Sequence, residues 1–196
     1  WTTNTDGTPI PGGCLPTRYD NVFFNNFSGA ISTASPVIVN SSTAECKNIT
    51  WVGVAGTPVF KTGTTQQSGQ YTDALNIYGS SIWQNGMLYQ VANTFYKSAV
   101  AGNTLTSNGV KIEGDTYFVA DGGWTLNDAF LSGAMTGPGI SYPQRGDLYF
   151  NRGTFNTNNQ ALTITSFGHY NDIYNTYPRS TRNLTLGSSL ITINGK

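Results

Sequence analysis

The sequence is poor in charged side chains. Its 196 residues include 10 Lys and Arg and 10 Asp and Glu, so only 10% of the chain is charged and the net charge is zero. An average globular domain has about 25% charged residues. The basic side chains are scattered singly, whereas a protein that binds nucleic acid or an anionic membrane normally carries a basic stripe. We therefore expect neither partner.

Long hydrophobic runs are also missing. No stretch approaches the roughly 20 apolar residues that a membrane-spanning helix needs. No Met precedes Trp1, and no basic segment followed by an apolar one marks a signal peptide. Solubility must come from Asn, Thr, Ser, Gln and Gly, a composition that suits a secreted or cell-surface protein. We expect a mature product or a segment excised from a longer chain.

Cysteine and histidine are too few for a structural zinc site. The only cysteines are Cys14 and Cys46, and the only histidine is His169, whereas such a site takes four ligands. Two cysteines in a polar chain of extracellular type favour a disulfide, with two separate buried thiols as the alternative. The closed loop of about 30 residues would stabilise the fold by roughly 3–4 kcal/mol in the chain-entropy model. We expect no metal and no cofactor.

Helical periodicity is absent as well. Gly and Pro recur too often for a long pattern of period 3.6, and the apolar residues alternate or come in short bursts. These bursts predict strands within NITWVGVAGTPVF (48–60), ALNIYGSSIW (74–83) and GMLYQVANTFYKSAV (86–100). The residues 66–70 form a polar loop between strands. No segment resembles an interdomain linker, so we expect residues 1–196 to form one domain.

Imperfect repeats decide the expected fold. GDTYF (114–118) returns as GDLYF (146–150), NTLTSNGVKI (103–112) resembles TFNTNNQALTI (154–164), and LNIYGSSIW (75–83) returns loosely as LTLGSSLITI (184–193). Short strands separated by Asn- or Gly-rich corners are typical of a β-solenoid, whose coils stack at about 4.8 Å and share one interior. We predict an all-β, right-handed parallel β-helix, with an antiparallel β-sandwich as the alternative.

The chain closes on RNLTLGSSLITING, from Arg182 to Gly195, with only Lys196 after it. The pattern predicts two half-buried strands joined by Gly-Ser-Ser. Proteins normally cover an exposed strand edge, because it can pair with another chain. We therefore expect another module of a longer protein to cap this end.

Several longer motifs follow one another along the chain. They are CLPTRYDNVFFNNFSG (14–29), ECKNITWVGV (45–54), LNIYGS (75–80), GGWTLNDAF (122–130), GTFNTNNQALT (153–163) and RNLTLGSSLITING (182–195). This succession resembles a module of very large secreted and cell-surface proteins of Bacteroidota, of the gliding-motility and adhesin type. The resemblance implies an extracellular, non-enzymatic module. It also implies a Cys14–Cys46 disulfide, because the two cysteines take the module's CxPT and CK positions.

Two aromatic-rich segments depart from that module, AMTGPGISYPQRG (134–146) and SFGHYNDIYNTYPRST (166–181). Exposed aromatic rings stack on the apolar faces of sugars, while Asn, Asp and Arg side chains supply directional hydrogen bonds. The predicted ligand-binding residues are therefore Tyr142, Tyr170, Asp172, Tyr174, Tyr177 and Arg179. The alternative is that these tyrosines pack over the side of the solenoid.

Catalysis needs converging groups, and the candidates are weak. His169 lies near Ser166 and Asp172 in the sequence, but no nucleophile elbow or oxyanion motif accompanies them. Parallel β-helices also host polysaccharide-cleaving enzymes, an analogy from the fold alone, and such enzymes need paired carboxylates. The acids near repeat positions are Asp115, Asp121, Asp128 and Asp147. We interpret them as turn residues and predict no catalytic residues.

Arg145, Gly146 and Asp147 spell the integrin-recognition tripeptide. A match of three residues arises often by chance. Gly146 and Asp147 occupy the same repeat position as Gly114 and Asp115, where no arginine precedes the glycine. We therefore interpret the pair as a turn before a strand.

The sequence as a whole predicts a non-catalytic extracellular module of a large bacterial surface adhesin. Its role would be spacing and display, with contact to glycans or another cell surface, and its other partners would be neighbouring modules of the same chain. Two alternatives stay open. One is a polysaccharide-active enzyme domain on a β-helix, and the other is the receptor-binding head of a viral or phage fibre, which we would expect to form a trimer.

Overall fold

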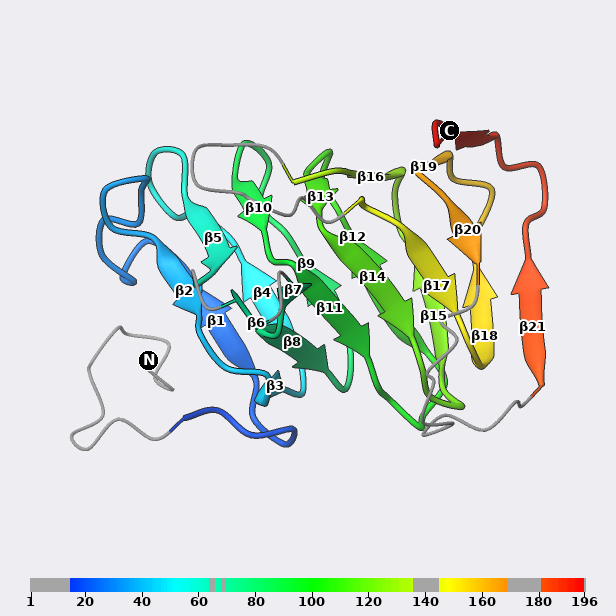
Figure 1. Cartoon of the computed structure of the whole chain (residues 1–196), viewed down its shortest axis with the longest axis horizontal. Helices are drawn as coiled ribbons and strands as arrows, with labels where there is room; N and C mark the ends of the chain where they lie inside the picture. The colour runs from blue at the N-terminus through cyan, green and yellow to red at the C-terminus, as the bar shows by residue number, and fades with distance from the viewer. Residues whose placement is uncertain (1–14, 64–65, 68–69, 136–144, 169–180, 196) are drawn as a thin grey trace.

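In a computed structural model the chain forms an all-β solenoid (Figure 1). The structure describes residues 15–63, 66–67, 70–135, 145–168 and 181–195. Over these ranges the chain forms short strands and no helix, and therefore no helix that could cross a membrane. Three parallel sheets contain all but two of the strands. The predicted parallel β-helix is confirmed, and the antiparallel β-sandwich is excluded.

The sheets are named A, B and C after the order in which the chain visits them. Sheet A consists of β1 (Val22–Phe24), β4 (Ile49–Trp51), β9 (Ser81–Ile82), β12 (Asn103–Thr106), β15 (Gly123–Leu126), β18 (Gly153–Asn156) and β21 (Arg182–Thr185). Sheet B consists of β2 (Val37–Val39), β5 (Val59–Thr62), β10 (Leu88–Gln90), β13 (Lys111–Glu113), β16 (Phe130–Gly133), β19 (Leu162–Ile164) and β22 (Ile191–Ile193). Sheet C consists of β3 (Ala44–Cys46), β8 (Ala74–Ile77), β11 (Asn93–Tyr96), β14 (Asp115–Phe118), β17 (Leu148–Phe150) and β20 (Phe167–Gly168).

One circuit through sheets A, B and C makes one rung of the column. Sheets A and B have seven strands each and sheet C has six, so within the described residues the last rung has only β21 and β22. The strands of sheet C lie side by side along the molecule in Figure 1. Because side chains alternate across a strand, the inward residues of all three sheets meet in one shared interior.

Aromatic rings fill much of this interior. Trp51, Trp83 and Trp124 are each at most 1% exposed. The ring of Phe24 stacks on that of Trp51, with centroids 3.9 Å apart. Each fully buried ring contributes roughly 2–3 kcal/mol of hydrophobic stabilisation. Since large side chains of successive rungs rest on one another, the core runs unbroken along the column.

Two of the three predicted repeats occupy equivalent places. Thr116 of GDTYF pairs with Leu148 of GDLYF, and Tyr117 pairs with Tyr149, so the two motifs are stacked strands of sheet C. The repeats at 103–112 and 154–164 both run from sheet A to sheet B, through β12–β13 and β18–β19.

The third predicted repeat is wrong. Residues 75–83 run from β8 in sheet C to β9 in sheet A, whereas residues 184–193 run from β21 in sheet A to β22 in sheet B. The two segments share Gly-Ser-Ser because small residues suit any tight corner. Local composition therefore cannot tell one corner of the coil from another.

Two long connections join sheet B to sheet C. Residues 63–73 connect β5 to β8, and residues 134–147 connect β16 to β17. By contrast, Gly114 alone connects β13 to β14. The first connection includes an antiparallel pair, β6 (Gln66–Gln67) and β7 (Gln70–Tyr71), where the sequence predicts only a polar loop. Connections of very different length are thus accommodated without breaking the stack of rungs.

The closing segment forms the two predicted strands, β21 and β22, but β21 is exposed along its whole length. Leu184 lies in register with the fully buried Phe155 of β18, and its side chain is nevertheless 40% exposed. The difference arises because one neighbouring rung covers β21, whereas β18 has a rung on each side.

Candidate functional site

The predicted ligand-binding residues lie outside the described residues. These are Tyr142, Tyr170, Asp172, Tyr174, Tyr177 and Arg179, and the same holds for His169 and Cys14. Their role stays a prediction.

The structure instead brings carboxylates and tyrosines together on the outer face of sheet C. In β14 and β17 the motifs DTYF and DLYF point their phenylalanines inward and their tyrosines outward. The ring of Tyr117 stacks on that of Tyr149, with centroids 4.8 Å apart, and on that of Phe95, at 4.4 Å. Asp115 and Asp147 precede these tyrosines by two residues and therefore lie on the same side of their strands. We call Asp115, Asp147, Tyr117 and Tyr149 the acid–tyrosine ladder.

Hydrogen bonds join the members of the acid–tyrosine ladder within and between rungs. Asp115 Oδ1 accepts from the backbone N–H groups of Gly146, at 3.1 Å, and Asp147, at 3.0 Å. The Tyr117 hydroxyl donates to Asp115 Oδ2 at 3.3 Å, and the Tyr149 hydroxyl donates to Asp147 Oδ2 at 3.1 Å. Asp115 thus fastens the corner of the next rung to its own strand.

Burial governs the electrostatics of these acids. Asp115 and Asp147 are each 6% exposed. Desolvation raises the pKa of Asp115 to about 6, the amide donors of Asp147 and Gly146 oppose the rise, and the neighbouring Asp147 charge adds to it. Asp147 Oδ1 is buried without a hydrogen-bond partner. Neither carboxylate is therefore open to solvent.

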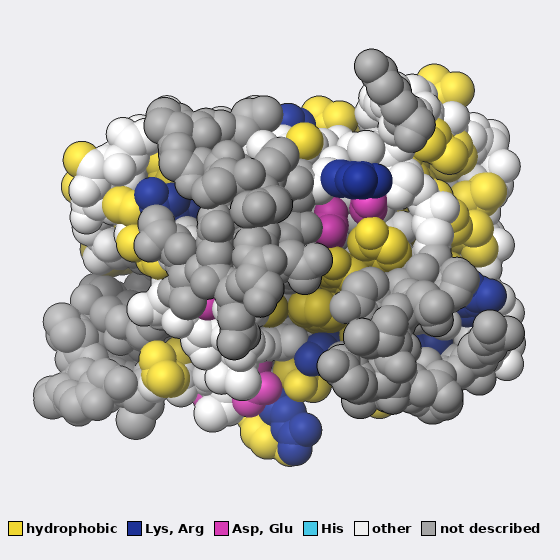
Figure 2. Space-filling model, viewed as in Figure 1, with side chains coloured by type: hydrophobic (Ala, Val, Ile, Leu, Met, Phe, Trp, Pro, Cys, Tyr) yellow, Lys and Arg dark blue, Asp and Glu magenta, His cyan; other side chains and the backbone are white. Residues whose placement is uncertain are grey.

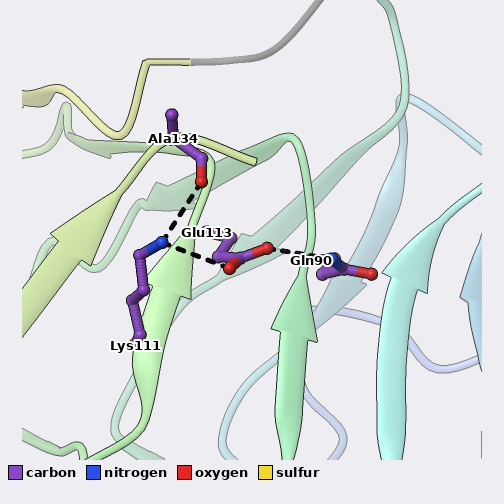
Figure 3. Close-up of polar contacts among 4 residues, drawn as sticks. All are labelled: Gln90, Lys111, Glu113 and Ala134. Atoms are coloured by element: carbon purple, nitrogen blue, oxygen red, sulfur yellow. Dashed lines mark hydrogen bonds and ion pairs between the residues drawn. The ribbon is translucent and has the colours of Figure 1, made fainter. Parts of the chain in front are cut away.

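A second polar network spans three successive rungs of sheet B beside this ladder (Figure 3). Lys111 Nζ lies 3.2 Å from Glu113 Oε1 and donates to the Ala134 carbonyl oxygen at 3.4 Å. Gln90 Nε2 donates to Glu113 Oε2 at 2.9 Å. Figure 2 shows Lys or Arg atoms next to Asp or Glu atoms above hydrophobic atoms on this side of the molecule. The network bonds β10, β13 and the end of β16 to one another.

The two other candidate acids also hold corners. Arg152 Nε donates to Asp121 Oδ1 at 2.7 Å. Asp128 Oδ1 accepts from the backbone N–H of Ser107 at 2.7 Å. In the part of the chain that the structure describes, no three His, Cys, Asp or Glu side chains gather to hold a metal ion. All four acids singled out from the sequence therefore lie at or beside a corner and bond to a neighbouring rung.

The integrin-type tripeptide is built into such a corner. Gly146 has a φ of 77°, and a Cβ placed there would lie 2.3 Å from the backbone of Gly133. Asp147 is buried and accepts from Tyr149. The aspartate carboxylate is therefore not presented to a receptor, which supports the interpretation as a turn.

A cavity of about 140 Å³ lies at the first rungs, near the start of the described chain. Its walls are mainly apolar and include Leu15, Val22, Ile38 and Cys46. Cys46 is buried and has no disulfide partner among the described residues, and desolvation raises the pKa of its thiol to about 12. Cys14 lies outside the described residues, so the Cys14–Cys46 disulfide stays a prediction.

The sequence carries a local signal for the acid–tyrosine ladder, in addition to the turn that it predicts. Asp-x-Tyr in both GDTYF and GDLYF places an acid and a phenol on one face of a strand, two residues apart. The hydrogen bond between Gln90 and Glu113 joins strands that are distant in sequence, so no local pattern predicts it.

Comparison with known proteins gives no relative. No protein-family model, no curated protein and no solved structure matches this chain. The resemblance to Bacteroidota surface modules therefore stays a prediction.

Proposed function

We propose that this chain is a non-catalytic extracellular module of a large bacterial surface adhesin, which spaces and displays other parts. The observation that carries the proposal is the continuous column of stacked rungs, with seven strands in each of two sheets and a filled interior. In such an array each rung contacts only its neighbours, so length can be added without changing the fold. That is what a spacer requires.

The position of the long connections supports display. Residues 63–73 and 134–147 both connect sheet B to sheet C. Rigid scaffolds commonly carry binding residues on such connections. We assign contact with glycans or another cell surface to Tyr142 in the second connection and to Tyr170, Asp172, Tyr174, Tyr177 and Arg179 in the connection between β20 and β21.

The engagement of the acids supports a role without catalysis. Asp115 binds two backbone N–H groups and a phenol, and Asp121 pairs with Arg152. General acid–base catalysis needs a carboxyl group within reach of a substrate oxygen. The bonds of these carboxyl groups go to the protein itself.

Insertion of a peptide epitope tests display. We expect an epitope inserted at Gly139 to leave the thermal unfolding midpoint unchanged and to be recognised by its antibody on the folded protein. The matched insertion at Gly114, where a single residue joins β13 to β14, should prevent folding. If the Gly139 insertion unfolds the protein as well, that connection is not a display site.

A glycan array tests surface contact. We expect binding by the unmodified protein, loss of binding in Tyr174→Ala, and retention in Tyr19→Ala, whose ring is 74% exposed and lies in neither aromatic-rich segment. Equal loss in both variants would contradict the assignment. Release of reducing ends from a polysaccharide, abolished by Asp115→Asn, would instead favour the enzyme, and a stable trimer in sedimentation would favour the fibre head.

A further inference from the structure

Three asparagines of this chain are followed directly by glycine, namely Asn85, Asn108 and Asn194. Asparagine is among the thermolabile residue types. Before glycine its side-chain carbonyl carbon is open to attack by the next backbone nitrogen, because glycine has no Cβ to hinder the approach. All three asparagines are exposed, so accessibility alone does not separate them. The hydrogen bonds of the reacting groups do.

Two of the pairs occupy the same corner of successive rungs. Asn85 and Gly86 lie between β9 of sheet A and β10 of sheet B, and Asn108 and Gly109 lie between β12 and β13. Each pair forms the centre of a tight turn closed by a backbone hydrogen bond, of 3.1 Å in the first turn and 3.0 Å in the second. The fold therefore supplies a matched pair of sites.

At Asn108 both reacting groups are engaged. Asn108 Nδ2 donates to the backbone carbonyl oxygen of Trp83, in the preceding rung, at 2.7 Å. The Gly109 N–H donates to Ser107 Oγ at 3.2 Å. The Asn108 N–H donates to the Asp128 carboxylate, which fixes the backbone of the turn as well. Attack at this site requires that the side chain and the glycine nitrogen first leave their partners.

At Asn194 the attacking nitrogen is engaged. The Gly195 N–H donates to the carbonyl oxygen of Thr165 at 2.7 Å, and the Asn194 N–H donates to that of Ile164 at 2.9 Å. This pair is therefore held by its backbone alone.

At Asn85 neither reacting group is engaged. Among the hydrogen bonds of the described residues, none involves the Asn85 side chain or the Gly86 N–H. The preceding rung is bound by Gln84 instead, whose Nε2 donates to the Val54 carbonyl oxygen at 2.7 Å and whose Oε1 accepts from the Val54 N–H at 2.8 Å. A Cβ placed on Gly86 would meet no atom within 4 Å, so the turn has room for a change of shape.

We propose that Asn85 is a site of spontaneous modification, where the asparagine converts to an aspartyl or isoaspartyl residue. The Gly86 nitrogen forms a bond to Asn85 Cγ, the bond between Cγ and Nδ2 breaks, and ammonia leaves with the proton of the glycine N–H. Water then opens the cyclic imide at either of its two carbonyl carbons. Water is the only co-reactant. The corner between sheets A and B gains one negative charge.

Peptide mapping after incubation in mildly alkaline buffer tests the proposal. Trypsin places the three pairs in separate peptides, 62–97, 98–111 and 183–196. Each conversion replaces an amide NH2 by a hydroxyl, a mass gain of about one dalton. We expect Asn85 to convert about tenfold faster than Asn108 or more, because two hydrogen bonds must break first at Asn108. Asn194 should convert at an intermediate rate.

Two controls separate the structure from the local sequence. In guanidinium chloride the three pairs should convert at similar rates, because the tertiary hydrogen bonds are gone. Ser107→Ala removes the acceptor of the Gly109 N–H and should speed conversion at Asn108 while leaving that at Asn85 unchanged. Thermal unfolding checks that this variant remains folded.

Two results would overturn the proposal. One is conversion at Asn85 that is no faster than at Asn108 in the folded protein, and the other is the same ratio of rates in the folded and the unfolded chain. The second comparison needs no variant, so it holds even if Ser107→Ala does not fold. Neither result bears on the epitope insertion or the glycan array, so this proposal and the proposed function fail independently.

Discussion

The outer faces of sheets A and C have the same backbone architecture and opposite chemistry. On sheet A, Thr125 stands outward between Thr104 and Asn156 with its hydroxyl unbonded. On sheet C, Tyr117 also stands outward but is only 5% exposed, stacked on its neighbours and bonded to Asp115. An outward position on this solenoid is therefore a surface position only where no other side chain packs against it.

The corners explain part of this difference. Before sheet C the chain turns through Gly114 in one rung and ends a long connection at Gly146 in the next. The amides of that second corner bind Asp115 and draw it against the protein. At the described corners before sheet A, no carboxylate bonds to an outward threonine of the sheet.

The largest expected loss of unfolding free energy comes from a substitution at the corner before sheet C. Gly114 has a φ of 120°, and a Cβ there would lie 2.1 Å from the carbonyl oxygen of Val91. Gly114→Ala should lower the free energy of unfolding by about 4 kcal/mol or more, since backbone must move. Gly86→Ala, at a corner just after sheet A with a φ of 79° and nothing within 4 Å, should cost only about 1 kcal/mol. Urea unfolding measures both, and equal costs would contradict the role of close approach.

The next largest effect compares the two faces directly. Tyr117→Ala removes a ring stacked between Phe95 and Tyr149 and should cost about 3–5 kcal/mol. Thr125→Ala removes an unbonded surface hydroxyl and should stay within about 0.5 kcal/mol. If the two substitutions cost the same in urea unfolding, the outer face of sheet C is not an interior.

A third effect concerns Cys46 at the edge strand of sheet C. If Cys46 is paired with Cys14, reduction should lower the free energy of unfolding by about 3–4 kcal/mol. Intact mass after alkylation in denaturant, with and without prior reduction, counts the free thiols. Two thiols alkylated without reduction would contradict the pairing. In that case burial and a thiol pKa of about 12 should keep Cys46 unreactive at pH 8 until the protein unfolds.

The smallest effect concerns the pH dependence of the acid–tyrosine ladder. The pKa of Asp115 is raised to about 6 in the folded state, so the folded protein holds this proton more tightly than the unfolded chain does. Stability from this group is complete below the unfolded pKa and is lost as the pH rises through 6, by about 2–3 kcal/mol in all. Asp115→Asn should flatten the fall in unfolding free energy between pH 4 and pH 8.

A matched control separates this effect from general titration. Thr17 holds the exposed Asp20 by hydrogen bonds that lower the pKa of that carboxyl, the opposite direction. Asp20→Asn should therefore leave the loss of stability through pH 6 unchanged. A fall that persists in Asp115→Asn would place the responsible proton on another group.

The fold could be predicted from the sequence because the repeats GDTYF and GDLYF are neighbouring strands in the structure. Their offset equals one circuit of the coil, and their tyrosines stack. The predicted repeat built on Gly-Ser-Ser is wrong because this tripeptide forms the corner before sheet A in one rung and the corner after sheet A in another. The acids were correctly recognised as corner residues, but their partners were not predictable. Asp115 binds the amide of Gly146, which is distant in sequence and becomes adjacent only when rung meets rung.

The order of residues indicates short strands and periodic corners, because both are local patterns, and it favours stacked parallel rungs; the sheet pairing then excludes the antiparallel β-sandwich. Tertiary structure alone decided which outward positions are buried. Tyr117 and Thr125 both follow the same alternation, and only the packing around each strand makes one an interior residue and the other a surface residue. Burial is a property of neighbours from distant parts of the chain, and no local pattern carries that information.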